Sequence, residues 1–134
     1  MPVVTQPEYP DFVFPDIPTS YDGELGLQDQ QDAWAFLQTG DLVGAKREFE
    51  DLLEIEQNFF PAAVGLGWVE MAGGRFQNAA TQFRLALDRQ ENYVPGLVGY
   101  GDALYRLDDI TTALKIFRDA LAIQPSLLRV ERIV

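Results

Sequence analysis

From residue 26 onward, apolar side chains recur every three or four positions, and polar side chains fill the places between them. In the segment 48–56, for example, Phe49, Leu52 and Leu53 share one helical face and acidic side chains take the other. Pro61 and Pro95 stand where a helix tolerates proline, in its first turn. The pattern predicts helices over 28–39, 42–56, 61–72, 76–89, 95–107 and 110–123, with a short seventh helix beginning near Ser126.

A single offset of 34 residues aligns most of this pattern with itself. It divides the chain into repeats over 26–59, 60–93 and 94–127. Small residues at the eighth and twentieth positions let two helices approach closely, and a Phe and a Leu fill the space between them. The positions common to all three repeats are Ala33, Gly67 and Gly101; Ala45, Ala79 and Ala113; Phe49, Phe83 and Phe117; and Leu53, Leu87 and Leu121.

This order of small residue, Ala, Phe and Pro resembles the tetratricopeptide repeat family over about residues 26–134. The resemblance implies an all-α fold, a right-handed superhelical α-solenoid of three helix-turn-helix repeats. A stack of repeats needs a terminal element over its last apolar face, so residues 128–134 are expected to form a C-terminal capping helix fragment. The chain departs from the family pattern at Asp29, Asp32, Leu52 and Glu70.

Residues 1–25, called the leader below, differ in kind from the repeats. They contain five of the eight prolines, which forbid a continuous helix and favour an extended or polyproline II conformation. They are also too aromatic for an inert linker. Phe12, Phe14 and Ile17 are spaced so that an extended segment offers them to one surface. We expect these side chains to pack on the inner surface of the repeats, of the same chain or of a neighbouring copy. The side chains expected to receive them are Trp34, Leu37, Trp68, Met71 and Tyr105.

Composition and charge narrow the possible functions. The chain has no cysteine and no histidine, which removes disulfides, thiolate metal sites and every nucleophile–histidine arrangement. The net charge of −11 lies in the first half, where residues 1–67 carry 13 acidic and 2 basic side chains, and such a surface repels nucleic-acid phosphates. The carboxylates Glu48, Glu50, Asp51, Glu54 and Glu56 are typical of the solvated face of a helix. We therefore predict no enzyme, no cofactor, no metal site and no nucleic-acid partner.

The resemblance also implies a concave surface lined by positions 2, 5, 9, 12 and 13 of each repeat. Gln30 and Gln38 occupy two of these positions. Trp34 and Trp68 occupy two others, although aromatic side chains at helical spacing can instead fill the core of the repeats. The predicted peptide-binding groove is apolar and aromatic apart from one arginine: Trp34, Leu37, Val64, Trp68, Met71, Val98, Tyr105 and Arg106.

The expected function is protein–protein interaction, in which the groove holds an extended apolar or proline-rich peptide. The alternative is homo-oligomerisation through the leader or the C-terminal face. No apolar run approaches 18 residues, so direct insertion into a membrane is not expected. The leader looks like the spacer that follows the anchor in bacterial envelope lipoproteins. This favours the periplasm or cell envelope, with a targeting segment removed, and the cytoplasm is the alternative.

Overall fold

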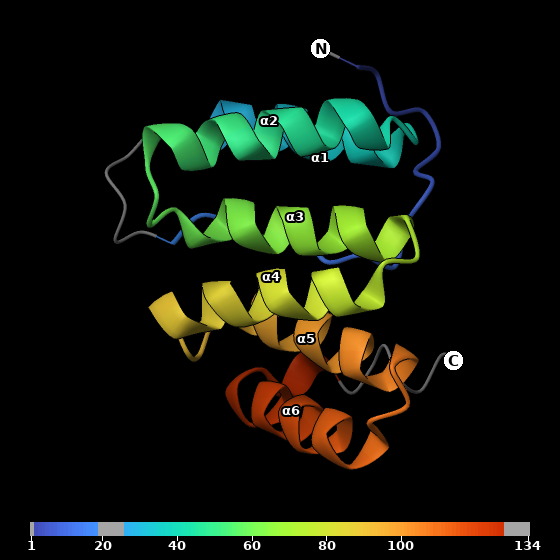
Figure 1. The fold of residues 1–134 in the computed structure, drawn as a ribbon, viewed down its shortest axis with the longest axis vertical. Coiled ribbons are helices and arrows are strands. Elements are labelled where there is room, and N and C mark those ends of the chain that lie inside the picture. The colour runs from blue at the N-terminus through green and yellow to red at the C-terminus, as the bar shows by residue number, and fades with distance from the viewer. Residues whose placement is uncertain (1, 19–25, 128–134) are drawn as a thin grey trace.

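The structure, a computed structural model, describes residues 2–18 and 26–127 and contains six α-helices in these ranges (Figure 1). Every helix end lies within one residue of its predicted place. The helical periodicity and the all-α fold class are thereby confirmed. The helices are α1 (Leu27–Gln38), α2 (Leu42–Ile55), α3 (Phe60–Ala72), α4 (Phe76–Arg89), α5 (Val94–Arg106) and α6 (Ile110–Ile123).

The turn inside each repeat is built at the same repeat position. Gly40, Gly74 and Asp108 are 34 residues apart, and all three have a positive φ, of 86°, 76° and 70°. Glycine reaches this left-handed conformation without a steric cost, and Asp is among the few other residues that tolerate it. Asp41 and Asp109 follow directly and cap α2 and α6, each accepting a hydrogen bond from the backbone N–H three residues later.

The helices stack in two layers. Each helix packs against its neighbours in the chain, and α3 also contacts both α1 and α5, so the first helices of the three repeats form a continuous layer. Helix α3 is the centre of the molecule, because every residue from Phe60 to Met71 is buried. Residues 2–18 of the leader run along this layer in Figure 1, on the side away from α2 and α4.

The phenylalanine and glycine positions of the repeat fit one another. Phe83 has no exposed surface and lies between α3 and α5. A Cβ atom added at Gly67 would lie 2.4 Å from this ring, and one added at Gly99 would lie 2.3 Å from it. Real Cβ atoms do not come so close to another carbon, so glycine is required at both positions for the helices to reach this separation.

The C-terminal end continues as a short 3-10 helix, Pro125–Leu127, which packs on α6. The predicted capping helix fragment, 128–134, lies outside the described residues. Within the described ranges, none of the helices has both the length and the apolar character needed to cross a bilayer.

Candidate peptide-binding groove

Two glutamines of α1 hold the backbone of the leader. Gln38 accepts a hydrogen bond from the Tyr9 N–H through Oε1 and donates one to the Tyr9 carbonyl through Nε2, both at 2.8 Å. Its own carbonyl accepts a further bond, at 2.9 Å, from the N–H of Glu8. About two helix turns away, Gln30 donates Nε2 to the carbonyl of Pro15 at 3.2 Å. The leader therefore runs antiparallel to α1.

The leader contains a turn between these two contacts. Gln30 and Gln38 are eight residues apart, or about 12 Å along a helix, whereas six residues of extended chain from Tyr9 to Pro15 span about 20 Å. A hydrogen bond of 3.2 Å from the Phe12 N–H to the Tyr9 carbonyl closes a turn over Pro10 and Asp11 that shortens the path. Proline followed by Asp suits such a turn. Residues 2–18 otherwise contain no helix or strand.

Aromatic rings fill the space between leader and helices. Phe12 stacks on Trp68 with ring centroids 4.5 Å apart and on Tyr9 at 4.9 Å. Trp68 is 1% exposed, and its other neighbour is Phe83 of the core, at 5.2 Å and nearly perpendicular. Phe14 meets Trp34 edge to face at 5.6 Å. Trp68 thus connects the core to the leader and belongs to both.

Residues 15–17 of the leader are held by further contacts. The Pro15 side chain is fully buried, and Ile17 is half-buried against the core. The Tyr93 hydroxyl, at the start of α5, donates a hydrogen bond to the carbonyl of Asp16. Sequence reasoning placed Gln30 and Gln38 on the concave surface but left them out of the predicted groove, and it did not mark Tyr93 at all. For the two glutamines the signal was present, because both occupy groove positions of the repeat.

The predicted groove residues fall into two groups. Those in the first group are buried or half-buried where the leader crosses α1 and α3 or in the adjoining core: Trp34, Leu37, Val64, Trp68, Met71 and Val98. Tyr105 and Arg106 form the second group, and both are exposed. The contacts described for the leader do not include these two, and Arg106 pairs with Asp102 at 3.6 Å. The leader therefore occupies only the N-terminal part of the predicted groove.

Two carboxyl groups have displaced pKa values. Burial raises the pKa of Asp102 above its ordinary value, and the charge of Arg106 offsets this only in part. Burial also acts to raise the pKa of Glu70, but the hydrogen bonds from Arg75 and Asn78, together with the charges of Arg75 and Lys46, outweigh it and the net shift is downward. Glu70 departs from the aromatic residue of the family pattern, and its ion pairs, at 2.5 Å to Arg75 and 3.8 Å to Lys46, satisfy the buried charge.

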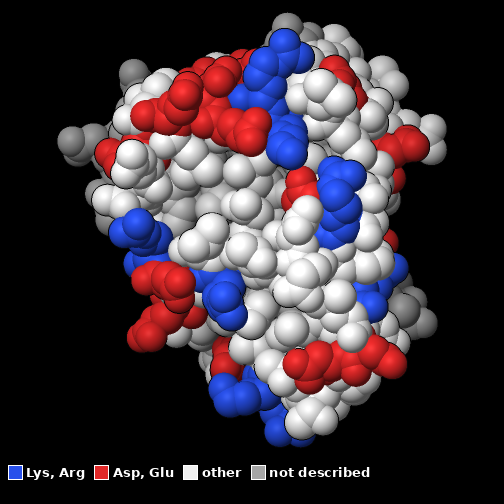
Figure 2. Space-filling view, viewed as in Figure 1, with Lys and Arg blue, Asp and Glu red and all other residues white. Residues whose placement is uncertain are grey.

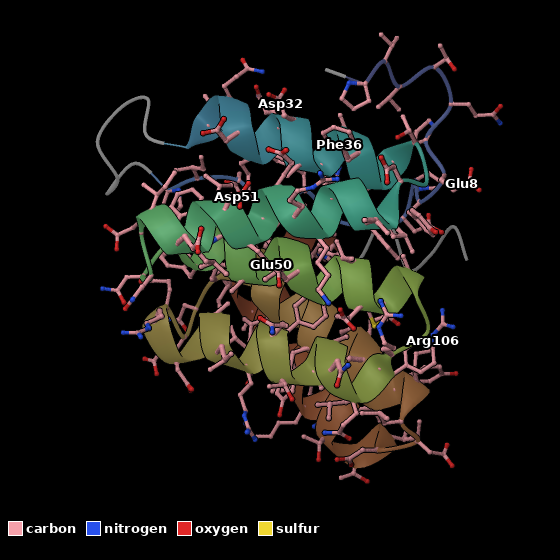
Figure 3. The ribbon with its side chains drawn as sticks, turned by 45° about the horizontal axis from the view of Figure 1, so that its top comes forward. Glu8, Asp32, Phe36, Glu50, Asp51 and Arg106 are labelled. Carbon is pink, nitrogen blue, oxygen red and sulfur yellow. The ribbon has the colours of Figure 1, made fainter. Side chains whose placement is uncertain are left out.

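Carboxylates elsewhere on the surface are solvated. Figure 2 shows acidic side chains gathered at the end of the molecule formed by α1 and α2. Glu50 and Asp51 lie exposed on α2, and Asp32 lies half-exposed on α1 (Figure 3). In residues 2–18 and 26–127, no three His, Cys, Asp or Glu side chains gather closely enough to hold a metal ion.

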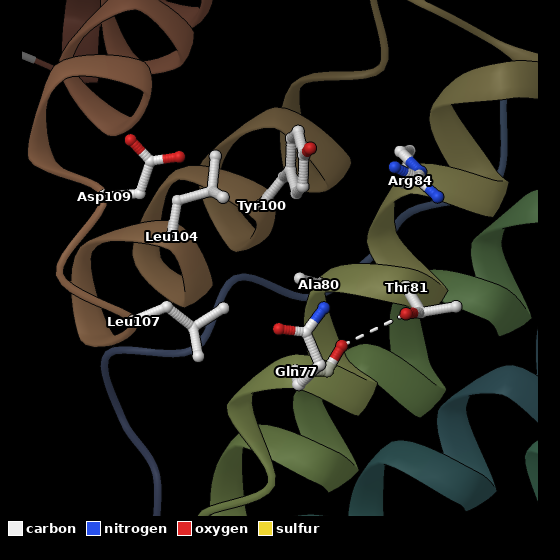
Figure 4. A pocket seen from close by; sticks show the side chains of 8 residues that line it. All are labelled: Gln77, Ala80, Thr81, Arg84, Tyr100, Leu104, Leu107 and Asp109. Atoms are coloured by element: carbon white, nitrogen blue, oxygen red, sulfur yellow. Dashed lines mark hydrogen bonds between the residues drawn. The ribbon is translucent and has the colours of Figure 1, made fainter.

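A separate hollow of about 380 Å³ lies between α4, α5 and the turn before α6 (Figure 4). None of residues 2–18 lines it. Its polar side chains are Arg84, Gln77, Thr81, Tyr100 and Asp109. The Thr81 hydroxyl donates a hydrogen bond to the backbone carbonyl of Gln77.

Comparison with known proteins agrees with this architecture. A family model described as tetratricopeptide repeat matches residues 32–94 and 64–127, which together cover most of the six helices. No curated protein matches the chain significantly. Because the match spans more than half of the chain and the helix pairs recur at its 34-residue interval, the chain belongs to the tetratricopeptide repeat family.

Proposed function

We propose that this chain is a non-catalytic protein–protein interaction module whose concave groove binds an extended apolar or proline-rich peptide. The observation that carries the proposal is the stacking of Phe12 of the leader on the buried Trp68 of α3. A proline-rich segment without helix or strand here occupies the groove in the way a peptide ligand would. Tetratricopeptide repeats generally mediate protein–protein interaction, which agrees with this role.

The contacts of the leader are those of peptide recognition. The Gln38 side chain forms hydrogen bonds with the backbone N–H and carbonyl of Tyr9. Such bonds contribute affinity whatever side chain the bound residue carries. The aromatic pairs of Trp68 and Trp34 add the apolar anchors that carry most of the energy in such interfaces. A tethered occupant has an effective concentration in the millimolar range, so an outside peptide must compete with the leader for the groove.

The composition of the chain and its family favour a binding role. The whole chain has no histidine or cysteine, and proteins of this family are generally interaction scaffolds without catalytic activity. The described groove contacts are aromatic stacking and backbone hydrogen bonds, which hold a ligand but activate no nucleophile.

Self-association is a second candidate. The side chains of Ile110 and Leu114, four residues apart and therefore on one face of α6, are 39% and 52% exposed, which is high for large apolar residues. A dimer could use this face, or two copies could exchange leaders. Light scattering over a concentration series distinguishes this candidate, because only self-association makes the mass rise with concentration.

The test is to weaken the leader in the full chain and offer it back as a peptide. Phe12→Ala removes the ring on Trp68 and should lower the free energy of unfolding by about 1–2 kcal/mol. Val3→Ala is the matched control, because Val3 is in the same segment and 80% exposed. A fluorescent peptide of residues 2–18 should bind the Phe12→Ala chain much more tightly than the unaltered or Val3→Ala chains, in which the groove is occupied.

Acrylamide quenching of tryptophan fluorescence provides an independent measurement. Loss of the Phe12 ring should increase quenching, since Trp68 is otherwise 1% exposed, and added peptide should reverse the increase. Equal quenching, stability and peptide binding for the Phe12→Ala and Val3→Ala chains would show that the leader is no ligand of the groove.

A further inference from the structure

The two glutamines that hold the leader are unequally satisfied. Gln38 bonds both the N–H and the carbonyl of Tyr9. Gln30 donates Nε2 to the carbonyls of Pro15, at 3.2 Å, and Pro61, at 2.9 Å, but its Oε1 is buried and has no hydrogen-bond partner among the described residues. The chemistry of residue 15 explains the difference, because proline has no N–H to donate.

The orientation of the Gln30 amide cannot relieve this oxygen. Two carbonyl oxygens face Nε2, and carbonyls only accept hydrogen bonds. Turning the amide over would bring Oε1 against both carbonyls and lose two bonds. Gln30 is 0% exposed, so the oxygen also has no access to bulk water, and a buried acceptor left in this state weakens the complex.

We propose that the groove is built for a segment that carries an N–H where the leader has Pro15, and that the leader is an imperfect occupant which such a segment replaces. This inference rests on the proposed function and names the ligand class. The partner is an extended segment that runs antiparallel to α1, with one residue held by Gln38 and aromatic residues three and five positions later against Trp68 and Trp34. Six positions later it has a residue other than proline. The N–H and the carbonyl of that residue both form hydrogen bonds with the Gln30 side chain.

The proposal also explains how a tethered ligand stays replaceable. A leader that formed both hydrogen bonds with Gln30 as well as with Gln38 would bind the groove more tightly. At its high effective concentration it would then outcompete other segments. Proline at position 15 withholds one hydrogen bond from the leader, while its ring is fully buried and keeps the segment ordered. A partner with an N–H at this position donates a hydrogen bond to Gln30 Oε1. The leader cannot form this bond, so the partner binds more tightly there.

Two synthetic peptides isolate the missing hydrogen. Both have the sequence of residues 2–18, one with alanine and one with N-methylalanine at position 15, so that the side chains are the same and only one peptide has the N–H. The full chain carrying Phe12→Ala, whose own leader is weakened, is the target. The alanine peptide should bind about five- to tenfold more tightly, as one buried hydrogen bond requires. In a target that also carries Gln30→Leu, the difference should vanish.

A measurement in the unaltered fold does not depend on that double variant. In the full chain with Pro15→Ala, the new amide of residue 15 should exchange with solvent as slowly as the amide of Tyr9, and far more slowly than that of the exposed Asp11. Fast exchange at residue 15, or equal affinity of the two peptides, overturns the inference and leaves the groove function intact. If neither these peptides nor the unaltered leader peptide binds, the proposed function fails as well.

Discussion

Replacing Gly99 by alanine tests the packing that sets the distance between repeats. The new Cβ would lie 2.3 Å from the ring of Phe83, more than 1 Å inside ordinary contact. The ring cannot retreat, because Gly67 borders it equally closely on α3 and Trp68 lies against it at 5.2 Å. Overpacking of this degree costs about 3 kcal/mol, and alanine recovers about 1 kcal/mol through its higher helix propensity. The free energy of unfolding should therefore fall by about 2 kcal/mol.

The same helix supplies a matched control. Gly96 is also a buried glycine of α5, but a Cβ there would lie 3.1 Å from a terminal methyl group of Leu87, which can rotate away. Alanine gains helix propensity there as well, and displacing this methyl group offsets part of the gain, so Gly96→Ala should leave the free energy of unfolding unchanged or raise it by up to about 1 kcal/mol. Urea denaturation followed by circular dichroism measures both variants under the same conditions.

A double-mutant cycle shows whether the loss arises at the named ring. Phe83→Leu removes Cε1 and Cζ, the two atoms nearest to the new methyl group at 2.3 and 2.5 Å, and leaves a flexible side chain in place of the ring. Gly99→Ala should therefore be less harmful in that background, with a coupling of at least about 1 kcal/mol. The reasoning is refuted if Gly99→Ala and Gly96→Ala cost the same, or if the cycle shows no coupling.

Two further predictions concern ionisable groups. Because the pKa of Glu70 is lowered on folding, its contribution to stability is complete above the ordinary value of 4.5 and is lost as the pH falls through the folded value. The stability difference between the unaltered chain and Glu70→Gln should therefore shrink in acid. The pKa of Asp102 is raised on folding, so its ionised carboxylate lowers the stability of the fold at neutral pH. Asp102→Asn should therefore be more stable than the unaltered chain at neutral pH, and this difference in stability should disappear as the pH falls below the ordinary value of 3.8. Denaturation at several pH values tests both, and parallel curves for the two variants would contradict the assignments. Millimolar calcium or magnesium should shift the melting temperature only marginally, because the carboxylates of α2 are solvated and do not converge; a large saturable shift would reveal a missed site.

Local rules made the helices and the repeat predictable. Helical periodicity and turn residues act over a few positions, so the bounds of α1 to α6 follow from the sequence to within one residue. The recurrence of Phe at the twenty-fourth position and of small residues at the eighth predicted the close helix pairs. The structure shows the reason in Gly67 and Gly101, where a Cβ would overlap the rings of Phe83 and Phe117.

The candidate site depended on contacts that no local pattern contains. Sequence reasoning marked Phe12, Phe14 and Ile17 of the leader and the tryptophans of the groove, but it could not pair them. Tyr9 and Gln38 are 29 residues apart, and Tyr93 bonds the carbonyl of Asp16 across 77 residues. Such contacts depend on how three repeats place their first helices side by side.

The glutamines of α1 show most clearly the limit of what can be predicted from the sequence alone. Gln30 and Gln38 stand at positions that face a groove. Glutamine side chains at such positions are ordinarily exposed to solvent. In the structure they are 0% and 6% exposed, because the leader covers them and its carbonyls satisfy their donors. Periodicity alone determined that these side chains share one helix face, since it reports only on neighbours within a few turns. Their burial was decided by the tertiary structure, because a second segment had to supply hydrogen-bond partners before two amides could leave water.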